Sequence, residues 1–587
     1  MEVVSGPSRW NTANPAHGDQ NGCRSHIHDH LLINDKPLES YSPLGAPEPS
    51  QQGAALVAVV ALAFLQGVAW GCSEVIQVKL GGICSVAGAP PPPPPNARLD
   101  VWPCLALTSG SALLLVSPLA ALLVHRKIKN ADVQLIALGV WLGSAVLLLS
   151  VGVVSPESFG SSDSASSGES AISGGSVSST GVGGDHAVVV EVVAWVGIVI
   201  NASCLAVLRP LLAILTADQV RDPVRRGKAV GMAYCFLVLG ASLGWAGASS
   251  AGSSSLLAIL SVHLAALFLA SLLLVAVKGR LVSHDNASWA ASSAVEMLAS
   301  ANGESSAEAG ARSTDASSAR GLWASLCDLV FYQSSAGNQT GGEPGTVLRE
   351  FVKLFMLAGS FRALAQQSVV WGTQAESMSH QLCVGMDKNS TSEAVAGAGP
   401  SASVDAAGET CFAIDEDAIW LASRICGLLL VLSVEAGGCS WIKWWAQRGV
   451  HRTVWHLYVG YGLLFIALCS SLLVQAAVDF TTGGGVSVLW QLPQWILLTV
   501  AETVVVIAGA EYSVGVAGLV SRTGAASTLF ALQGAGTLLG TGVLLALGAD
   551  AAGGRGVAGV GGAAHLSAVA CLAAALFALQ RYLWPPQ

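Results

Sequence analysis

The chain has 587 residues, of which 52% are hydrophobic and only 11% are charged. A soluble domain carries about 25% charged residues, so this depletion, together with long apolar stretches, predicts an all-α membrane protein that crosses the bilayer many times. The net charge of −9 gives no sign of a nucleic-acid partner, and none is expected. We find no motif for an enzyme, a metal site or a cofactor, and the thirteen cysteines form no Cys-x-x-Cys pair.

The chain begins with a polar stretch over residues 1–50, which we interpret as a disordered cytoplasmic tail rather than a signal peptide. Its His26, His28 and His30 offer metal ligands, although a solvated role is commoner in such a tail. Apolar stretches of spanning length then recur about twelve times. They lie near residues 53–76, 101–124, 133–154, 188–212, 229–247, 255–277, 350–371, 418–441, 455–478, 490–516, 525–548 and 561–583.

A long Ser- and Ala-rich stretch over residues 281–348 divides these segments six and six. The division predicts two six-helix bundles, at residues 51–280 and 349–584, joined by a mostly disordered cytoplasmic linker. Such a two-halved arrangement is typical of transporters with a binding site at the midplane. Alternate connections are rich in Lys and Arg, so the positive-inside rule places both termini in the cytoplasm.

The connections on the opposite side are of low complexity. Pro90–Pro95 forms a stiff polyproline spacer, and residues 155–186 are rich in Ser and Gly. A third connection carries the sequon at Asn389 and two cysteines, Cys383 and Cys411. Glycosylation and a disulfide both belong to the lumenal side, and both remain open against an unused sequon and free thiols.

One acidic residue stands out inside an apolar segment. Glu502 lies near the middle of residues 490–518, which are long enough to span a bilayer. An ionised carboxylate at that depth costs several kcal/mol, about 3 on insertion scales, unless it faces water or a partner. Glu502 is therefore either a proton- or cation-binding group or a paired structural carboxylate within the bundle.

Four groups of residues, in register along the chain, resemble the helix signatures of the proton-dependent oligopeptide transporter family, the peptide and nitrate branch of the major facilitator superfamily. The resemblance covers nearly all the helical chain and implies the major facilitator fold. The matching residues are Ser117-Pro118-Leu119, Leu208-Arg209-Pro210 with Thr216-Ala217-Asp218-Gln219-Val220, Leu364-Ala365-Gln366-Gln367 with Trp371 and Gln374, and Gln491-Leu492-Pro493-Gln494-Trp495 with Glu502 and Ala510-Glu511-Tyr512-Ser513.

The resemblance implies roles for individual residues. Glu502 would bind a substrate amino group and take part in proton coupling, and Arg209 would attract an anionic group or pair with an acid. Arg209 alternatively extends to the inner interface. The further residues placed at the substrate and proton site are Gln366, Gln367, Trp371, Glu511 and Gln533, and those at the inner gate are Asp218, Gln219 and Arg225. Glu511 has a structural alternative, and Asp218 alternatively offsets local basic charge.

The chain also departs from the family pattern. The first helix of the family carries two Glu and an Arg, where this chain has Gln66, Ala69 and Trp70, with Glu74 one turn further out. The pocket Trp of the eleventh helix is replaced by Gln533. A cavity with fewer ionisable groups has fewer places to hold a proton and fewer charges to orient a zwitterion.

Three functions remain open at this stage. The first is a secondary active transporter, in a plasma or vacuolar/lysosomal-type membrane, that carries small peptides or related nitrogenous solutes together with protons. The second is a membrane sensor or scaffold that no longer transports. The third is a facilitator of another small anion, such as nitrate, that needs no proton gradient.

Overall fold

The computed structural model describes the helical core and part of one connection. The described residues are 49–86, 98–125, 128–154, 184–220, 223–250, 256–281, 353, 355–376, 378–385, 403–404, 409–414, 416–437, 452–481, 485–515, 522–551, 569–576 and 578. The three histidines of the tail, the proline run, the Ser/Gly-rich connection, the sequon and the predicted linker beyond residue 281 lie outside them. Contacts group residues 52–587 into one compact unit.

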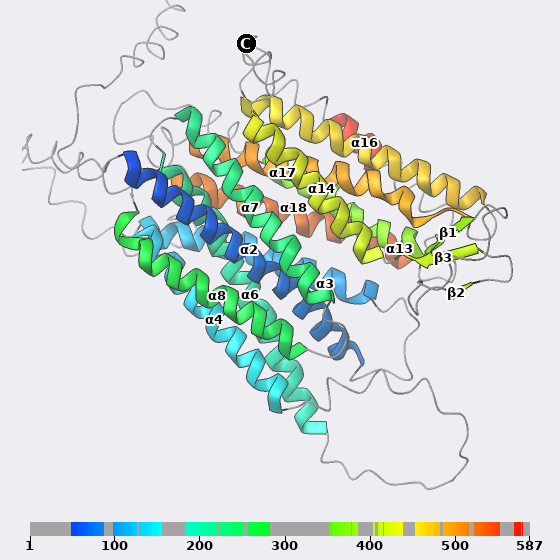
Figure 1. Ribbon diagram of the computed structural model, residues 1–587, viewed down its shortest axis with the longest axis horizontal. Coiled ribbons are helices and arrows are strands. Elements are labelled where there is room, and N and C mark those ends of the chain that lie inside the picture. The colour runs from blue at the N-terminus through cyan, green and yellow to red at the C-terminus, as the bar shows by residue number, and fades with distance from the viewer. Residues whose placement is uncertain are drawn as a thin grey trace, which may run out of the picture. The chain divides into compact units, whose positions relative to one another are not determined.

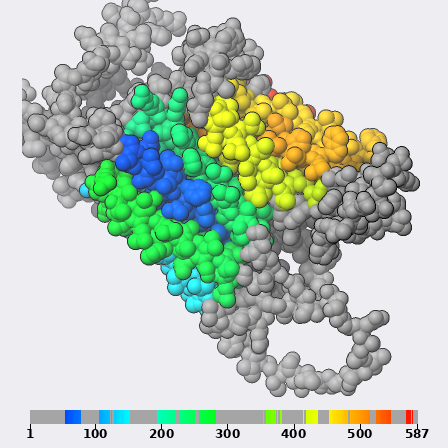
Figure 2. All heavy atoms as spheres, viewed as in Figure 1, coloured from blue at the N-terminus to red at the C-terminus, as the bar shows by residue number. Residues whose placement is uncertain are grey.

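Six long helices form the first part of this unit. They are α2 (Pro49–Val86), α3 (Arg98–His125), α4 (Asn130–Val154), α6 (Gly184–Asp218), α7 (Pro223–Ser250) and α8 (Leu256–Val277), which ends in the short turn η3 (Lys278–Arg280). Long apolar segments form helices because a helix satisfies its own backbone hydrogen bonds, which lipid cannot do. In the space-filling view, α2 lies on the surface beside α8 (Figure 2).

The second part begins with a broken helix and continues with four long ones. The broken helix consists of η5 (Phe355–Ser360), α12 (Phe361–Ala365), η6 (Gln366–Val369) and α13 (Val370–Glu376). The long helices are α14 (Glu416–Gly437), α16 (Arg452–Phe480), α17 (Leu492–Gly515), preceded by the turn η8 (Val488–Gln491), and α18 (Arg522–Ala551). Helices of the two parts pack together, α3 against α18 and α7 against α14 and α17 (Figure 1).

Ten of the described helices are long and apolar enough to cross a membrane. Of the twelve segments predicted from sequence, the seventh is the broken helix, and the twelfth is described only over residues 569–576 and 578. Outward-facing side chains agree with a lipid environment. On α8, for example, Leu257, Phe268 and Leu272 are exposed whereas His263 is buried. An apolar surface of this kind is stable in hydrocarbon and unfavourable in water.

Small residues allow α2 and α7 to approach each other closely, as their Gly-rich sequences suggest. Gly67 and Gly71 on α2 face the backbone of α7 at Leu237 and Ala241. In return, Gly240 and Gly244 on α7 face the backbone of α2. A Cβ at any of these four glycines would collide with backbone atoms of the other helix, which cannot move aside as a flexible side chain can.

We therefore expect Gly67→Ala to lower the thermal stability of the detergent-purified protein, because overpacking of this kind costs about 1–3 kcal/mol. Gly143→Ala on α4 is the matched control, since an added Cβ there meets nothing within 4 Å. The measurement is the melting temperature of each variant. Equal melting temperatures for the two variants would contradict the close contact.

Two of the sequence motifs meet where α3 packs against α6. Pro210 lies inside α6 and has no N–H to donate to the carbonyl of Ala206, four residues earlier. Ser117 on α3 supplies the missing donor, with its Oγ 2.8 Å from Ala206 O. The Ser-Pro-Leu and Arg-Pro motifs thus form one structural unit, which holds the backbone beside Arg209 in place.

A small antiparallel sheet, in the order β1-β3-β2, follows α13 (Figure 1). Its strands are β1 (Gln381–Gly385), β2 (Ser403–Val404) and β3 (Glu409–Ala413), and sequence analysis did not predict them. The register of β1 and β3 places Cys383 directly opposite Cys411. Directly opposed residues in antiparallel strands have Cα atoms about 4.5–5.5 Å apart, a separation that a disulfide spans.

We accordingly expect Cys383 and Cys411 to be linked when the protein is made in an oxidising compartment. Peptide mapping by mass spectrometry without reduction should detect a linked pair of peptides, which separates after reduction. The Cys383→Ser variant serves as a control, because it cannot form the linked pair. Alkylation of both thiols in the unreduced wild-type protein would contradict the prediction.

Candidate functional site

Glu502, the acidic residue that stood out in the sequence, has a cationic partner. On α17 its Oε1 accepts a hydrogen bond from Nη1 of Arg362 on α12, at 2.8 Å. The pair is only partly covered, since the side chains of Glu502 and Arg362 are 28% and 42% exposed. Both groups interact electrostatically with Tyr234 on α7. The pair therefore faces the first set of helices rather than lipid.

The chain around Arg362 is irregular. Its winding changes from a π-helix at Phe355–Ser360 to a short α-helix and then to a 3₁₀-helix at Gln366–Val369. Segments of π-helix and 3₁₀-helix have less favourable backbone hydrogen bonds than an α-helix, and they often occur at functional sites and hinges. Interrupted membrane helices also mark substrate sites in transporters. The broken segment thus provides an independent reason to place a site at Arg362.

Arg209 on α6 contributes a second cation from the first set of helices. Its guanidinium carbon lies 3.9 Å above the ring of Trp70 on α2. Trp70 occupies the position where the family pattern has an Arg, so an aromatic face here supports a cation from another helix. Arg209 Nε is buried and has no hydrogen-bond partner among the described residues. Arg209 also interacts electrostatically with Glu74, one turn beyond Trp70.

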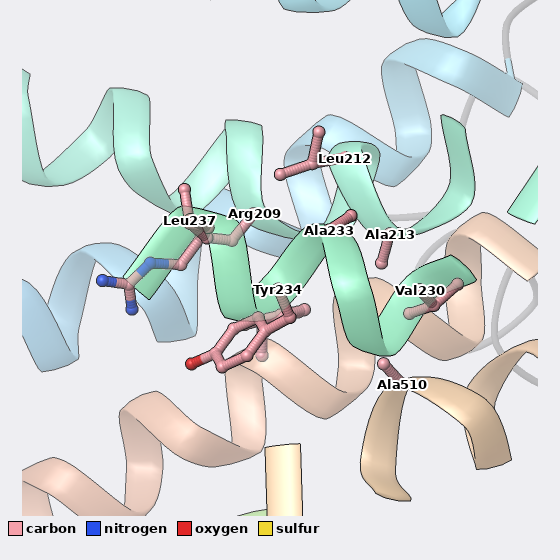
Figure 3. A pocket seen from close by; sticks show the side chains of 9 residues that line it. Arg209, Leu212, Ala213, Val230, Ala233, Tyr234, Leu237 and Ala510 are labelled. Carbon is pink, nitrogen blue, oxygen red and sulfur yellow. The ribbon is translucent and has the colours of Figure 1, made fainter. Parts of the chain in front are cut away.

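A small pocket lies beside Arg209, between the two sets of helices. Most of its lining comes from α6 and α7, and Ala510 and Phe530 close it from α17 and α18. Figure 3 shows Arg209 and Tyr234 extending toward the same side of the pocket, away from Val230 and Ala510. Apolar side chains line the rest of the pocket, which has room for about one water molecule in this closed arrangement.

Arg424 and Tyr234 belong to this site, although sequence analysis assigned neither to it. Arg424 on α14 lies over the ring of Trp420 at 4.5 Å, and Trp420 contacts Trp245 of α7 with ring centroids 4.5 Å apart. Arg424 interacts electrostatically with both Arg209 and Tyr234. The sequence held a signal for Arg424, because an ionisable residue inside a spanning segment is a functional candidate by default.

The predicted glutamines and Trp371 act mainly in packing. Gln367 donates to Gly540 O of α18 at 3.2 Å, and Gln366 is buried beside the same glycine. Trp371 is 0% exposed, packs edge-on against Trp495, and its carbonyl accepts from Gln491 at 2.9 Å. These contacts join the seventh- and tenth-helix motifs, and they favour a structural role for Trp371. Gln533 on α18 is also buried.

Glu511 lies apart from the pair formed by Glu502. Nine residues further along α17, it is about 13 Å nearer the end predicted to face the cytoplasm. There His456 Nδ1 lies 3.6 Å from Glu511 Oε2, while His456 Nε2 lies 3.4 Å from Glu435 Oε1. Sequence analysis placed Glu511 with the substrate site, whereas the structure places it in a separate buried cluster.

The residues predicted for the inner gate lie where α6 meets α7. Asp218 and Gln219 are buried at the end of α6, whereas Arg225 is exposed at the start of α7. Nearby, Ala217 and Val230 form an apolar cluster with Ala510 of α17. Apolar contacts between the two sets of helices therefore lie on the side of Arg209 toward the end of α6, which is predicted to face the cytoplasm, while the contact between Trp245 and Trp420 lies on the opposite side.

Comparison with known proteins gives a fold but no sequence relative. No protein-family model matches the chain, and no curated protein matches its sequence at the significance required. Among solved structures, the POT family transporter PepTSo is similar over 92% of this chain and 98% of its own, with a TM-score of 0.53 and 14% identity.

Two further structures have comparable similarity. A POT family transporter in complex with 5-aminolevulinic acid covers 90% of this chain and 95% of its own, with a TM-score of 0.54 and 11% identity. The human organic anion transporter MFSD10 (TETRAN) covers 92% and 100%, with a TM-score of 0.51 and 13% identity. The chain is therefore an integral, multi-pass membrane protein with the major facilitator fold of these transporters.

Proposed function

We propose that this chain is a secondary active transporter that carries small nitrogenous solutes with a carboxylate group, together with protons, by alternating access. We further propose that it is a divergent member of the proton-dependent oligopeptide transporter family, on the strength of the motifs in register and the shared fold. One observation supports the proposal most strongly. The ion pair of Arg362 and Glu502 interacts electrostatically with Tyr234, and so does Arg209, although Tyr234 and Arg209 belong to the other set of helices.

The charges of the site suit a solute with an amino and a carboxylate group. Arg209, Arg362 and Arg424 outnumber Glu502 and Glu74, so the site attracts an anionic group. A planar guanidinium binds a carboxylate with two parallel hydrogen bonds, and no residue that the structure describes forms a hydrogen bond with the buried Arg209 Nε. Glu502 offers the amino group of the solute an opposite charge. When the amino group binds to Glu502, it would replace Arg362 as the partner of this carboxylate.

Structures with the same fold support this class of solute. One POT family transporter was solved with 5-aminolevulinic acid, and a peptide transporter POT variant with alafosfalin. Alternating access requires that solute and proton bind the inward and outward states with different affinities, since equal affinities shift nothing. The helices of the two sets meet on both sides of Arg209, which gives the molecule two places to open.

The excess of arginines favours a second candidate, a facilitator of small anions that needs no proton gradient. The organic anion transporter of the same fold is consistent with it. In this case Glu502 would only hold Arg362 in position. The two candidates differ in whether flux responds to a pH gradient, because only proton coupling ties transport to the carboxylate.

The test is uptake by the purified full-length protein reconstituted in proteoliposomes. Radiolabelled dialanine, trialanine, 5-aminolevulinic acid, alanine and nitrate are offered with and without an inward proton gradient. The first proposal expects accumulation of a peptide or amino acid above equilibrium only with the gradient. Flux of an anion that is insensitive to the gradient selects the facilitator. Ligand-induced stabilisation without flux would support a non-transporting sensor and overturn both transport proposals.

A further inference from the structure

The cluster of Glu435, His456 and Glu511 joins three helices at one end of the second set. Glu435 lies near the end of α14, His456 near the start of α16 and Glu511 near the end of α17. All three side chains are more than nine-tenths buried, with exposures of 4%, 2% and 8%. Burying three ionisable groups away from water is unfavourable unless they interact with one another.

The geometry around His456 is complete only when the ring carries an additional proton. Each ring nitrogen faces a carboxylate oxygen, Nε2 toward Glu435 at 3.4 Å and Nδ1 toward Glu511 at 3.6 Å. A neutral imidazole has a single N–H, so one of the two carboxylates would then face a nitrogen lone pair. An imidazolium points an N–H at each carboxylate and forms an ion pair with both, although Nδ1 makes no hydrogen bond within the described residues.

The cluster touches the helix set that moves against it in alternating access. Glu511 lies against Gly227 at the start of α7, where an added Cβ would come within 2.7 Å of its Oε1. Cys235, further along α7, interacts electrostatically with Glu435. Separation of α7 from α17 at this end would therefore uncover Glu511 and admit water to His456.

We propose that Glu435, His456 and Glu511 form a proton-binding site that is coupled to opening of the inner gate. The neutral His456 ring takes up one proton from a hydronium ion, which leaves a water molecule, and holds it while the gate is closed on the cluster. The same proton leaves to water on that side when α7 separates from α17. The inference rests on the proposed transport function for its role in coupling, but proton binding itself depends only on the cluster.

The groups facing His456 come from every helix packed around it. They are Glu435 of α14 and Glu511 of α17, with Cys235 of α7 behind Glu435. The connection at 438–451 lies outside the described residues. In the described part of the chain, no group of three His, Cys, Asp or Glu residues is arranged to hold a metal ion.

The decisive variant is His456→Gln, with His263→Gln as the matched control. His263 on α8 is equally buried, and its Nδ1 lies 2.8 Å from Ala69 O, but no carboxylate in the described residues contacts it. Melting temperatures of the three full-length proteins are measured from pH 5 to pH 8. Because the folded protein binds the proton at His456, wild type should gain stability relative to His456→Gln as the pH falls from 8 to 5, by about 2 °C in melting temperature.

The His263→Gln control distinguishes proton binding at His456 from the effect of replacing any buried histidine. A buried histidine that stays neutral in the folded protein takes up its proton only on unfolding, so wild type should lose stability relative to His263→Gln as the pH falls. For His456→Gln, a constant difference or a shift in that same direction would show a merely structural histidine and overturn the proposal. This measurement needs no substrate, so it decides the proton site even when the wild-type protein transports nothing.

Coupling is tested separately with dialanine in proteoliposomes. His456→Gln should keep the rate of counterflow exchange at equal pH within about twofold of the wild-type rate. Its proton-driven accumulation of dialanine should fall by about tenfold or more, because only accumulation requires that a bound proton moves with the solute. Unchanged accumulation by the variant would remove the cluster from coupling. Failure of the wild-type protein in both assays would instead count against the proposed function.

Discussion

Glu502→Gln is expected to lower proton-driven uptake by at least tenfold while the protein still folds. The amide keeps an oxygen that can accept the hydrogen bond from Arg362, which is 2.8 Å long in the wild type. This hydrogen bond becomes weaker because its acceptor is no longer charged. The amide cannot take up a proton, however, and offers no negative charge to a substrate amino group. Uptake with and without a pH gradient, together with the melting temperature, measures both parts of this prediction.

A carboxylate outside the site provides the control for Glu502. Asp479 lies exposed near the end of α16, where its Oδ1 accepts from Gln475 at 2.9 Å. Asp479→Asn should therefore transport like the wild type. If the ion pair acts as a unit, Arg362→Gln combined with Glu502→Gln should lose no more activity than the worse single variant. Proton-driven uptake at the wild-type rate in Glu502→Gln would exclude the carboxylate from coupling.

Arg209→Gln is expected to raise the KM for a carboxylate-bearing solute by about 10- to 150-fold. A hydrogen bond to a charged group contributes about 1.5–3 kcal/mol, which corresponds to that range in affinity. Arg209→Lys should recover only part of the loss, because an ammonium keeps the charge but neither stacks on Trp70 as a planar group nor binds a carboxylate with two hydrogen bonds. Initial uptake rates over a range of solute concentrations give the KM.

The specificity of this effect distinguishes substrate contact from general damage. Arg280→Gln, at an exposed position at the end of η3, removes a positive charge far from the pocket and should leave the KM unchanged. The amide of the same solute, which lacks the carboxylate, should lose little affinity in Arg209→Gln. Equal losses for the acid and the amide would show that Arg209 does not contact the carboxylate.

The sequence by itself determined the class of protein, because apolar segments of spanning length admit few structures other than helices in a membrane. It also singled out Glu502, since an ionisable group in an apolar segment is costly and therefore noticeable, and the resemblance of the motifs singled out Arg209. The many small residues of the apolar segments indicated close helix packing, which the structure shows between α2 and α7 at Gly67 and Gly240. The fold that the motifs implied is confirmed by similarity to solved transporters.

Only the tertiary structure decided which of these groups meet. Arg362 and Glu502 are 140 positions apart, and the sequence gives no spacing rule for a contact between different helices. The same holds for His456, which meets Glu435 and Glu511 from two other helices, and for Trp70, which supports Arg209. A helical periodicity tells which residues share a face, but helix packing alone determines which faces oppose each other. That is why the sequence, which placed Glu511 about 13 Å from Glu502 and kept a structural role open for it, could not show which side chains of other helices it meets.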